Sequence, residues 1–199
     1  LLAFYPFAVY FSAIYTEAQY LLGCLGAFYH LRRREYLRAG CWGLLVGLTR
    51  PNGFLLSVPL AVIGAHHVFP KWTWLGEPRF ESPGLRRPPT ATLALALLTP
   101  AFGTLLYMGY VYQLTGDPFI WMRGHAAWGR VYQGVSQLVM DRYDYIAAQG
   151  LYGYTASAPT DFMNSCAMLF ALALIWPVTR RLGLAYGVFM AVNLVPPLL

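Results

Sequence analysis

The chain has 199 residues, of which 58% are hydrophobic, 17% aromatic and only 11% charged. Soluble domains carry about 25% charged residues, so this composition excludes an ordinary soluble domain and is typical of a polytopic helical membrane protein. The net charge of +6 does not indicate nucleic-acid binding, because most basic residues gather in clusters beside apolar segments.

Three basic clusters predict how the chain is oriented in a membrane. They contain Arg32, Arg33, Arg34 and Arg38; Lys71, Arg79, Arg86 and Arg87; and Arg180 and Arg181. Cytoplasmic loops are enriched in lysine and arginine, so we expect these clusters on the cytoplasmic side. Together with their acidic neighbours they carry +7, whereas the remaining segments carry −1.

The apolar segments before the second cluster predict one full span and two shorter helices. Crossing the hydrocarbon core takes about 20 helical residues, so the first span should begin near Phe11 and hold Glu17 inside or at its edge. Tyr36–Val68 is too short for two such spans. It predicts a pair of short helices at Ala39–Leu48 and Phe54–His67, either tilted or re-entrant.

The second half of the chain predicts further spans and one long outer loop. A cytoplasmic loop at about 70–89 precedes a span at Thr90–Tyr112, and an extracytoplasmic loop follows at about 113–160. Phe162–Val178 then crosses back, and Tyr186 begins a further span. Both ends of the sequence are apolar, so we interpret residues 1–199 as part of a transmembrane domain, with both termini of the full protein missing.

Within the outer loop, Val135–Gln149 has a moderately amphipathic helical pattern. Asp117 is expected to start an Asx turn, and Arg142 is expected to be solvated in the ordinary way. Three cysteines, Cys24, Cys41 and Cys166, lie in apolar runs and show no metal-ligand spacing. We therefore expect them to be small buried side chains, with neither a disulfide framework nor a metal site.

Arg50 is the most informative single residue, because it stands in the apolar stretch GLTRPNGFLL at 47–56. A charge at the centre of a bilayer costs roughly 2.5–3.5 kcal/mol and persists mainly where it faces a cavity or a partner. Pro51 and Gly53 should break the helix, which membranes tolerate only inside protein or beside water. Arg50 is thus either a side chain that reaches the lipid head groups or an anion site in a membrane enzyme.

Three segments resemble the PIG-V-like mannosyltransferases of the GT-C superfamily. They are YPFAVYFSAIYTEAQYLLGCLGAFY, AGCWGLLVGLTRPNGFLLSVPLA and the outer-loop segment GDPFIWMRGHAAWGR. The resemblance implies an all-α, GT-C-like transmembrane bundle with one long outer loop. It also implies transfer of mannose from a polyprenyl-phosphate-linked donor to a lipid or glycolipid acceptor on the extracytoplasmic or lumenal face. The tip reads TRPNG where eukaryotic members more often carry Arg-Ser-Asn, so the acceptor need not be a glycosylphosphatidylinositol precursor.

The resemblance also suggests roles for particular residues. The family's catalytic base lies in a first outer loop, which would be upstream of Leu1, and leaves Glu17 as the alternative acid in this sequence. Arg50 suits a donor phosphate because its planar fork gives bidentate, charge-assisted hydrogen bonds, and Asn52 adds an amide donor. His125 and Arg130 flank Trp128, whose indole is a platform for a sugar ring or, alternatively, part of an interfacial aromatic belt.

The partners expected from this interpretation are membrane lipids, the lipid-linked sugar donor and the lipid or glycolipid acceptor. Nucleic acid is not an expected partner. The sequence indicates no cofactor besides the sugar donor and does not determine whether a divalent metal is required. The location would be the plasma membrane in a prokaryote or the endoplasmic reticulum membrane in a eukaryote. A secondary transporter also has broken helices and intramembrane charge. A non-catalytic membrane subunit is the third possibility.

Overall fold

The computed structural model describes residues 16–69, 89–121, 123 and 135–194. The regular structure in these residues is entirely helical, which confirms the predicted all-α class. The elements are α2 (Glu17–Arg32), α3 (Tyr36–Thr49), the short 3₁₀ helix η2 (Pro51–Leu56), α4 (Ser57–Val68), α5 (Thr90–Thr115), α7 (Val135–Ser157), α8 (Pro159–Leu182) and α9 (Leu184–Leu194).

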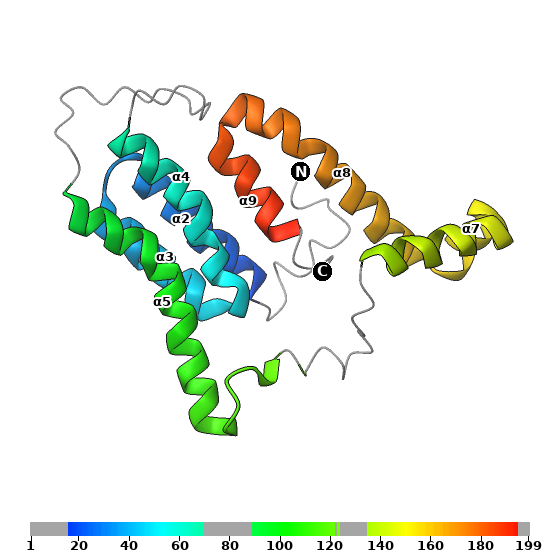
Figure 1. Cartoon of the computed structure of the whole chain (residues 1–199), viewed down its shortest axis with the longest axis horizontal. Coiled ribbons are helices and arrows are strands. Elements are labelled where there is room, and N and C mark those ends of the chain that lie inside the picture. The colour runs from blue at the N-terminus through cyan, green and yellow to red at the C-terminus, as the bar shows by residue number, and fades with distance from the viewer. Residues whose placement is uncertain (1–15, 70–88, 122, 124–134, 195–199) are drawn as a thin grey trace.

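Helix α3 lies at the centre of a compact bundle. It packs against α2 on one side and against α5 on another, while α9 packs against α4 and α8 (Figure 1). The fully buried aliphatic side chains of the bundle include Leu31, Val46, Leu56 and Leu60. The ring of Phe28 adds contacts to α9, with its centroid 5.1 Å from that of Tyr186.

Small residues allow α3 and α5 to approach closely. Gly43 and Gly47 have the four-residue spacing that brings helix backbones together in membranes. At this crossing Gly103 of α5 lies against Gly47, and the Thr104 hydroxyl donates a hydrogen bond to the Gly47 carbonyl at 3.3 Å. The close crossing of α3 and α5 therefore depends on glycine, which has no side chain, at positions 47 and 103.

Within the residues that the structure describes, two helices, α5 and α8, are long and apolar enough to cross a membrane. They agree with the spans predicted at Thr90–Tyr112 and Phe162–Val178. No residue of α8 is buried, and its exposed side chains include Leu169, Phe170 and Trp176. The two short helices predicted in Tyr36–Val68 are also present, as α3 and α4.

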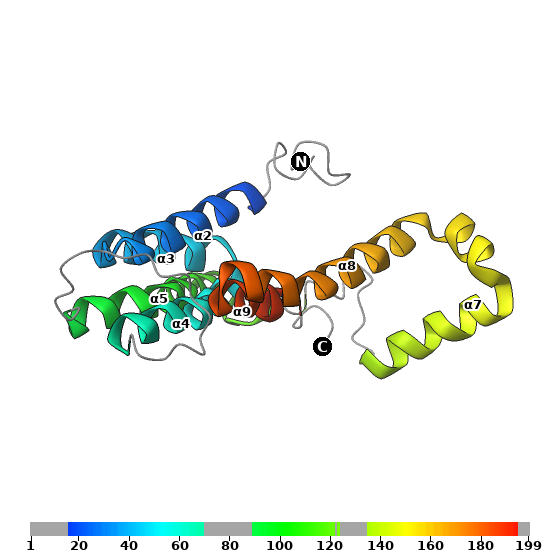
Figure 2. The same cartoon turned by 90° about the horizontal axis from the view of Figure 1, so that it is seen from above.

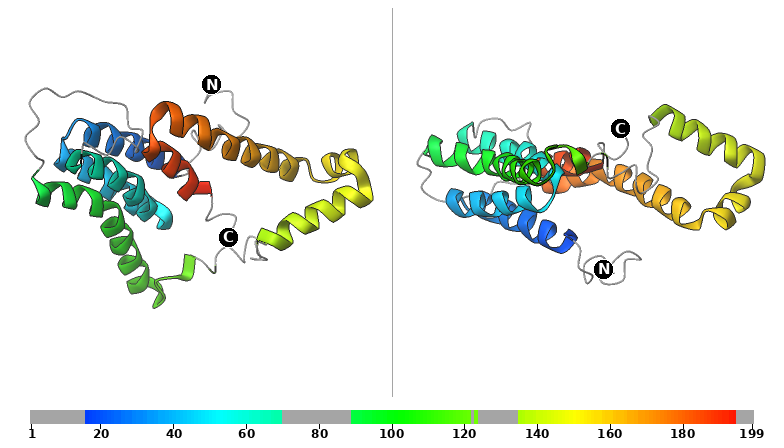
Figure 3. Two further views of the ribbon diagram at one scale, coloured as in Figure 1. Left: turned by 45° about the horizontal axis from the view of Figure 1, so that its top comes forward. Right: turned by 90° about the horizontal axis from the view of Figure 1, so that it is seen from below.

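Helix α7 and the first half of α8 project away from the other helices (Figures 2 and 3). The helix predicted at Val135–Gln149 is confirmed, and the chain turns at Gly150, whose φ of 71° lies in the left-handed region. The Tyr154 hydroxyl donates to the Asp161 carboxylate at 2.5 Å, and Arg142 Nε lies 2.8 Å from the same oxygen. Arg142 is exposed, as expected, and the turn at Gly150 also brings Asp161 within its reach.

The smaller predictions have mixed outcomes. Asp117 forms the expected Asx turn, with its Oδ1 accepting a hydrogen bond from Phe119 N at 2.9 Å. Cys24, a residue of α2, is buried as expected. Cys41 and Cys166 are exposed, so that prediction is wrong for both, because they lie on outward faces of apolar helices.

Candidate functional site

The break after α3 positions Arg50. Arg50 has extended backbone angles, φ −147° and ψ 146°, and Pro51 opens η2 immediately after it. The Gly53 amide donates to the Arg50 carbonyl at 2.9 Å. A Cβ at Gly53 would overlap the Val46 carbonyl oxygen and lie 2.8 Å from Gly47 Cα, so only glycine fits. The predicted helix break at Pro51 and Gly53 is confirmed.

The guanidinium of Arg50 contacts the beginning of α2. Its Nη2 donates to Glu17 Oε1, and its Nε donates to Thr16 Oγ1 at 2.9 Å. Its Cζ lies 5.7 Å from the ring centroid of Tyr20, one turn further along α2. The structure therefore brings together two residues that the sequence singled out separately, Glu17 and Arg50.

This ion pair is half-buried, with 32% of the Arg50 side chain and 27% of the Glu17 side chain exposed. Pairs that retain this much exposure contribute about 0–1 kcal/mol after solvent screening, so we do not regard the pair as a major source of stability. Its main consequence is chemical. The positive charge of Arg50 is compensated within the protein and does not need a lipid head group.

The pair leaves hydrogen-bonding capacity for a ligand. Within the described residues, Arg50 uses two of the five N–H donors of a guanidinium. Glu17 Oε2 is buried and accepts no hydrogen bond from the described part of the chain. The N–H groups of Arg50 that make no bond within the described residues thus lie beside the Tyr20 ring, and a guanidinium N–H suits the oxygen of an anionic group.

Helix α9 also reaches this cluster. The Tyr20 hydroxyl donates to Asn193 Oδ1 at 2.9 Å, and Asn193 Nδ2 donates to the Phe189 carbonyl at 2.8 Å. Thr16, Tyr20 and Asn193 were not predicted from the sequence. Tyr20 follows Glu17 by three residues, a spacing that places both on one helix face and could have identified it. No local signal identifies Asn193, which is 173 residues from Tyr20.

Of the other residues predicted to bind the donor, the structure describes only Asn52. Asn52 lies in η2, two residues after Arg50, with its side chain half-buried. His125, Trp128 and Arg130 lie outside the described residues, so their predicted part in the site stays a prediction. In the ranges that the structure covers, no group of three or more His, Cys, Asp or Glu side chains could hold a metal ion.

Charge is segregated between the two ends of the bundle. Helix α2 runs from Glu17 to Arg32, whose Nε donates to the Tyr186 hydroxyl of α9 at 2.9 Å. Helix α9 follows directly after Arg180 and Arg181 of α8, so the arginines of α2, α3 and α8 share one end. We call this the basic end; among the described residues it holds six arginines and the single acid Glu35.

Comparison with protein-family models, with curated proteins and with solved structures found no match to this chain. The described residues form an all-α helical bundle, in which two helices are long enough to span a membrane and Arg50 makes a half-buried pair with Glu17.

Proposed function

We propose that this protein is a GT-C-type mannosyltransferase of the membrane. It transfers mannose from a polyprenyl-phosphate donor to a lipid or glycolipid acceptor on the extracytoplasmic face. The observation that carries the proposal is the position of Arg50, at a helix break opposite the basic end, with donors left over after Glu17 and Thr16 are satisfied.

The membrane placement is supported by the exposed surface of α8 and by the charge segregation. A helix with an apolar surface and no buried residue would be poorly solvated in water but well solvated by lipid. Arginines concentrate on the cytoplasmic side of membrane proteins, so the basic end faces the cytoplasm and Arg50 faces outward.

In the proposed reaction the phosphate leaves the anomeric carbon and gains negative charge as the glycosidic bond breaks. Arg50 stabilises that charge with the N–H groups that Glu17 and Thr16 do not use. A carboxylate must accept the proton of the acceptor hydroxyl. The resemblance implies a base in a first outer loop, and we assign Glu17 the role of positioning Arg50.

The test is Arg50→Lys in cells carrying the complete gene. Lysine keeps the charge but loses the planar fork, so we expect mannose transfer to fall roughly a hundredfold or more, the usual effect of removing a donor that stabilises developing charge. Protein level and membrane insertion should hardly change. Transfer is measured in isolated membranes with a polyprenyl-phosphate-mannose donor, at matched protein level.

The matched control is Arg181→Lys, an exposed arginine at the basic end. It should transfer mannose at the wild-type rate. The ion pair with Glu17 also favours a second function, that of a non-catalytic membrane subunit in which the pair is purely structural. Wild-type transfer by Arg50→Lys would favour that alternative and remove the basis for the phosphate site.

A further inference from the structure

Helix α9 is hydrogen-bonded to α2 at two points. The Tyr20 hydroxyl bonds Asn193 at 2.9 Å, and Arg32 Nε donates to the Tyr186 hydroxyl at 2.9 Å. Tyr20 stands near the beginning of α2 and Asn193 near the end of α9, so the two helices run in opposite directions. The first of these bonds lies beside Arg50, and the second lies at the basic end.

The hydrogen-bond chain through Asn193 fixes the orientation of its amide. Nδ2 donates to the Phe189 carbonyl at 2.8 Å, and a carbonyl oxygen can only accept. Oδ1 therefore faces the Tyr20 hydroxyl, which must donate its proton. Two successive hydrogen bonds thus connect the backbone of α9 to the phenol, so the packing of α9 sets the position of the Tyr20 ring.

That ring is one of three groups that hold the guanidinium of Arg50. Thr16 Oγ1 accepts a hydrogen bond from Nε at 2.9 Å, and Glu17 Oε1 accepts one from Nη2. The Tyr20 centroid lies 5.7 Å from Cζ, a distance at which a cation and an aromatic ring attract each other. The hydrogen bonds restrain two nitrogens of the guanidinium, and the ring restrains the tilt of the plane that they share.

We propose that Tyr20 and Asn193 are positioning residues, which hold the Arg50 guanidinium in the orientation that the leaving phosphate requires. This proposal rests on the mannose transfer proposed above. Neither side chain has to contact the donor, because both act through Arg50. Since Arg50 stabilises charge that develops as the glycosidic bond breaks, a loss of positioning should lower kcat and leave KM nearly unchanged.

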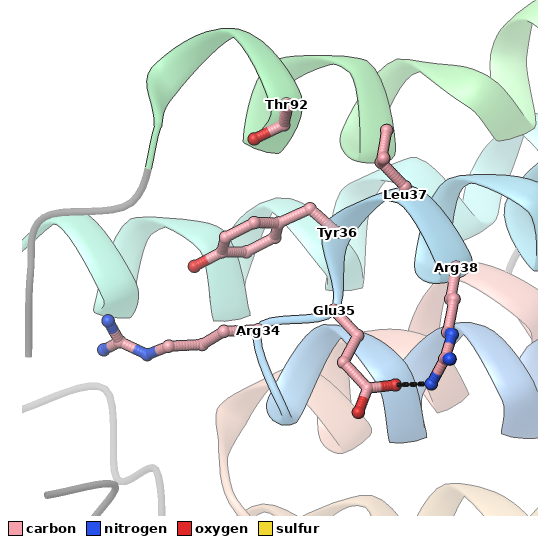
Figure 4. Close-up of a pocket in the computed structure, with 6 residues that line it drawn as sticks. All are labelled: Arg34, Glu35, Tyr36, Leu37, Arg38 and Thr92. Carbon is pink, nitrogen blue, oxygen red and sulfur yellow. Dashed lines mark hydrogen bonds and ion pairs between the residues drawn. The ribbon is translucent and has the colours of Figure 1, made fainter.

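A matched pair of tyrosines tests this role. Tyr20→Phe and Tyr186→Phe each remove one hydrogen bond between α2 and α9 and keep the ring. Tyr186 lies at the basic end, where charged side chains pair with one another, as Glu35 does with Arg38 (Figure 4). Weaker packing of α9 would affect both variants, whereas a loss of Arg50 positioning would affect Tyr20→Phe alone.

Mannose transfer is measured in membranes containing the full-length protein, at matched protein level and over a range of polyprenyl-phosphate-mannose concentrations. The kcat of Tyr20→Phe should fall about fivefold, the effect of one neutral hydrogen bond, with KM unchanged. Asn193→Leu removes the same bond from the α9 side and should give a similar fall, while Tyr186→Phe should keep the wild-type kcat. Wild-type kcat in both Tyr20→Phe and Asn193→Leu, a raised KM in place of a lowered kcat, or equal falls in the two tyrosine variants would overturn the proposal.

A double variant separates this proposal from the proposed function. In the Arg50→Lys background, Tyr20→Phe should cause no further loss of kcat, because the group that Tyr20 positions has been replaced. Independent, multiplying losses would overturn the positioning role and leave the phosphate role of Arg50 in place. Wild-type transfer by Arg50→Lys alone would overturn the proposed function, and the positioning role with it.

Discussion

At the scale of single residues, the stability of the bundle is most sensitive to substitutions where the backbones of α3 and α5 touch. A Cβ built at Gly103 would lie 2.5 Å from the Leu44 carbonyl oxygen and 3.1 Å from Gly47 Cα. Both are backbone atoms of α3, which cannot turn aside as a flexible side chain does. Gly109, six residues further along the same helix, has nothing within 4 Å of the corresponding position.

These two glycines make a matched pair for mutation. Gly103→Ala should destabilise the protein by about 1–3 kcal/mol, the usual effect of overpacking, because α3 and α5 must separate. Gly109→Ala should leave stability unchanged or raise it by about 0.5–1 kcal/mol, because alanine is the better helix former. Denaturation of the purified proteins in mixed micelles measures both. A neutral Gly103→Ala variant would show that the close crossing is absent in solution.

At the scale of elements, the α2–α3 turn is organised around one carboxylate. Hydrogen bonds from His30 above all, and then from Arg38 and Arg33, lower the pKa of Glu35 from 4.5 to about 2. Because the folded-state pKa is depressed, the ionised carboxylate stabilises the turn above pH 4.5. That contribution is lost as the pH falls from about 4.5 towards 2.

The prediction for this turn concerns pH. The thermal stability of the wild-type protein should decline between pH 4.5 and pH 2 more steeply than that of Glu35→Gln, which has no carboxylate to titrate at this position. At neutral pH the variant should be the less stable of the two. Unfolding is followed by circular dichroism in detergent across this range. Parallel curves for the two proteins would contradict the hydrogen-bonded turn.

At the scale of the whole molecule, the ends of the bundle differ in charge. Among the described residues the basic end carries six arginines and one acid, and the remaining described segments carry three arginines and five acids. Helix α7 is one of the segments outside the basic end, and the side chain of its Tyr152 is 86% exposed. In the proposed membrane placement, Tyr152 and Arg50 lie on the outer side.

Sidedness can be measured by thiol labelling of intact cells. In a background with Cys24, Cys41 and Cys166 replaced by alanine, Tyr152→Cys should react with a membrane-impermeant maleimide. Gly76→Cys, in the segment of the sequence between α4 and α5, should react only after lysis. The reverse result, with Gly76→Cys labelled in intact cells and Tyr152→Cys labelled only after lysis, would show that the topology is inverted and that Arg50 lies on the cytoplasmic side.

The elements of this protein were largely predictable because each depends on local sequence. Apolar length predicted α5 and α8, Pro51 and Gly53 predicted the break at Arg50, and Asp117 predicted its own Asx turn. Each signal acts over a few residues, through backbone geometry or through the length of an apolar run. The sequence alone therefore determined the helical class, the position of the break and the clustering of arginine.

The partners of those residues were decided only by the tertiary structure. Glu17 and Arg50 are 33 residues apart, and no local pattern pairs them; the packing of α2 beside α3 brings them together. Asn193 reaches Tyr20 only because α9 packs back into the bundle, and Arg142 reaches Asp161 only because Gly150 turns the chain. Such contacts depend on how helices cross, which depends on shape complementarity between distant segments and not on the composition of any one of them.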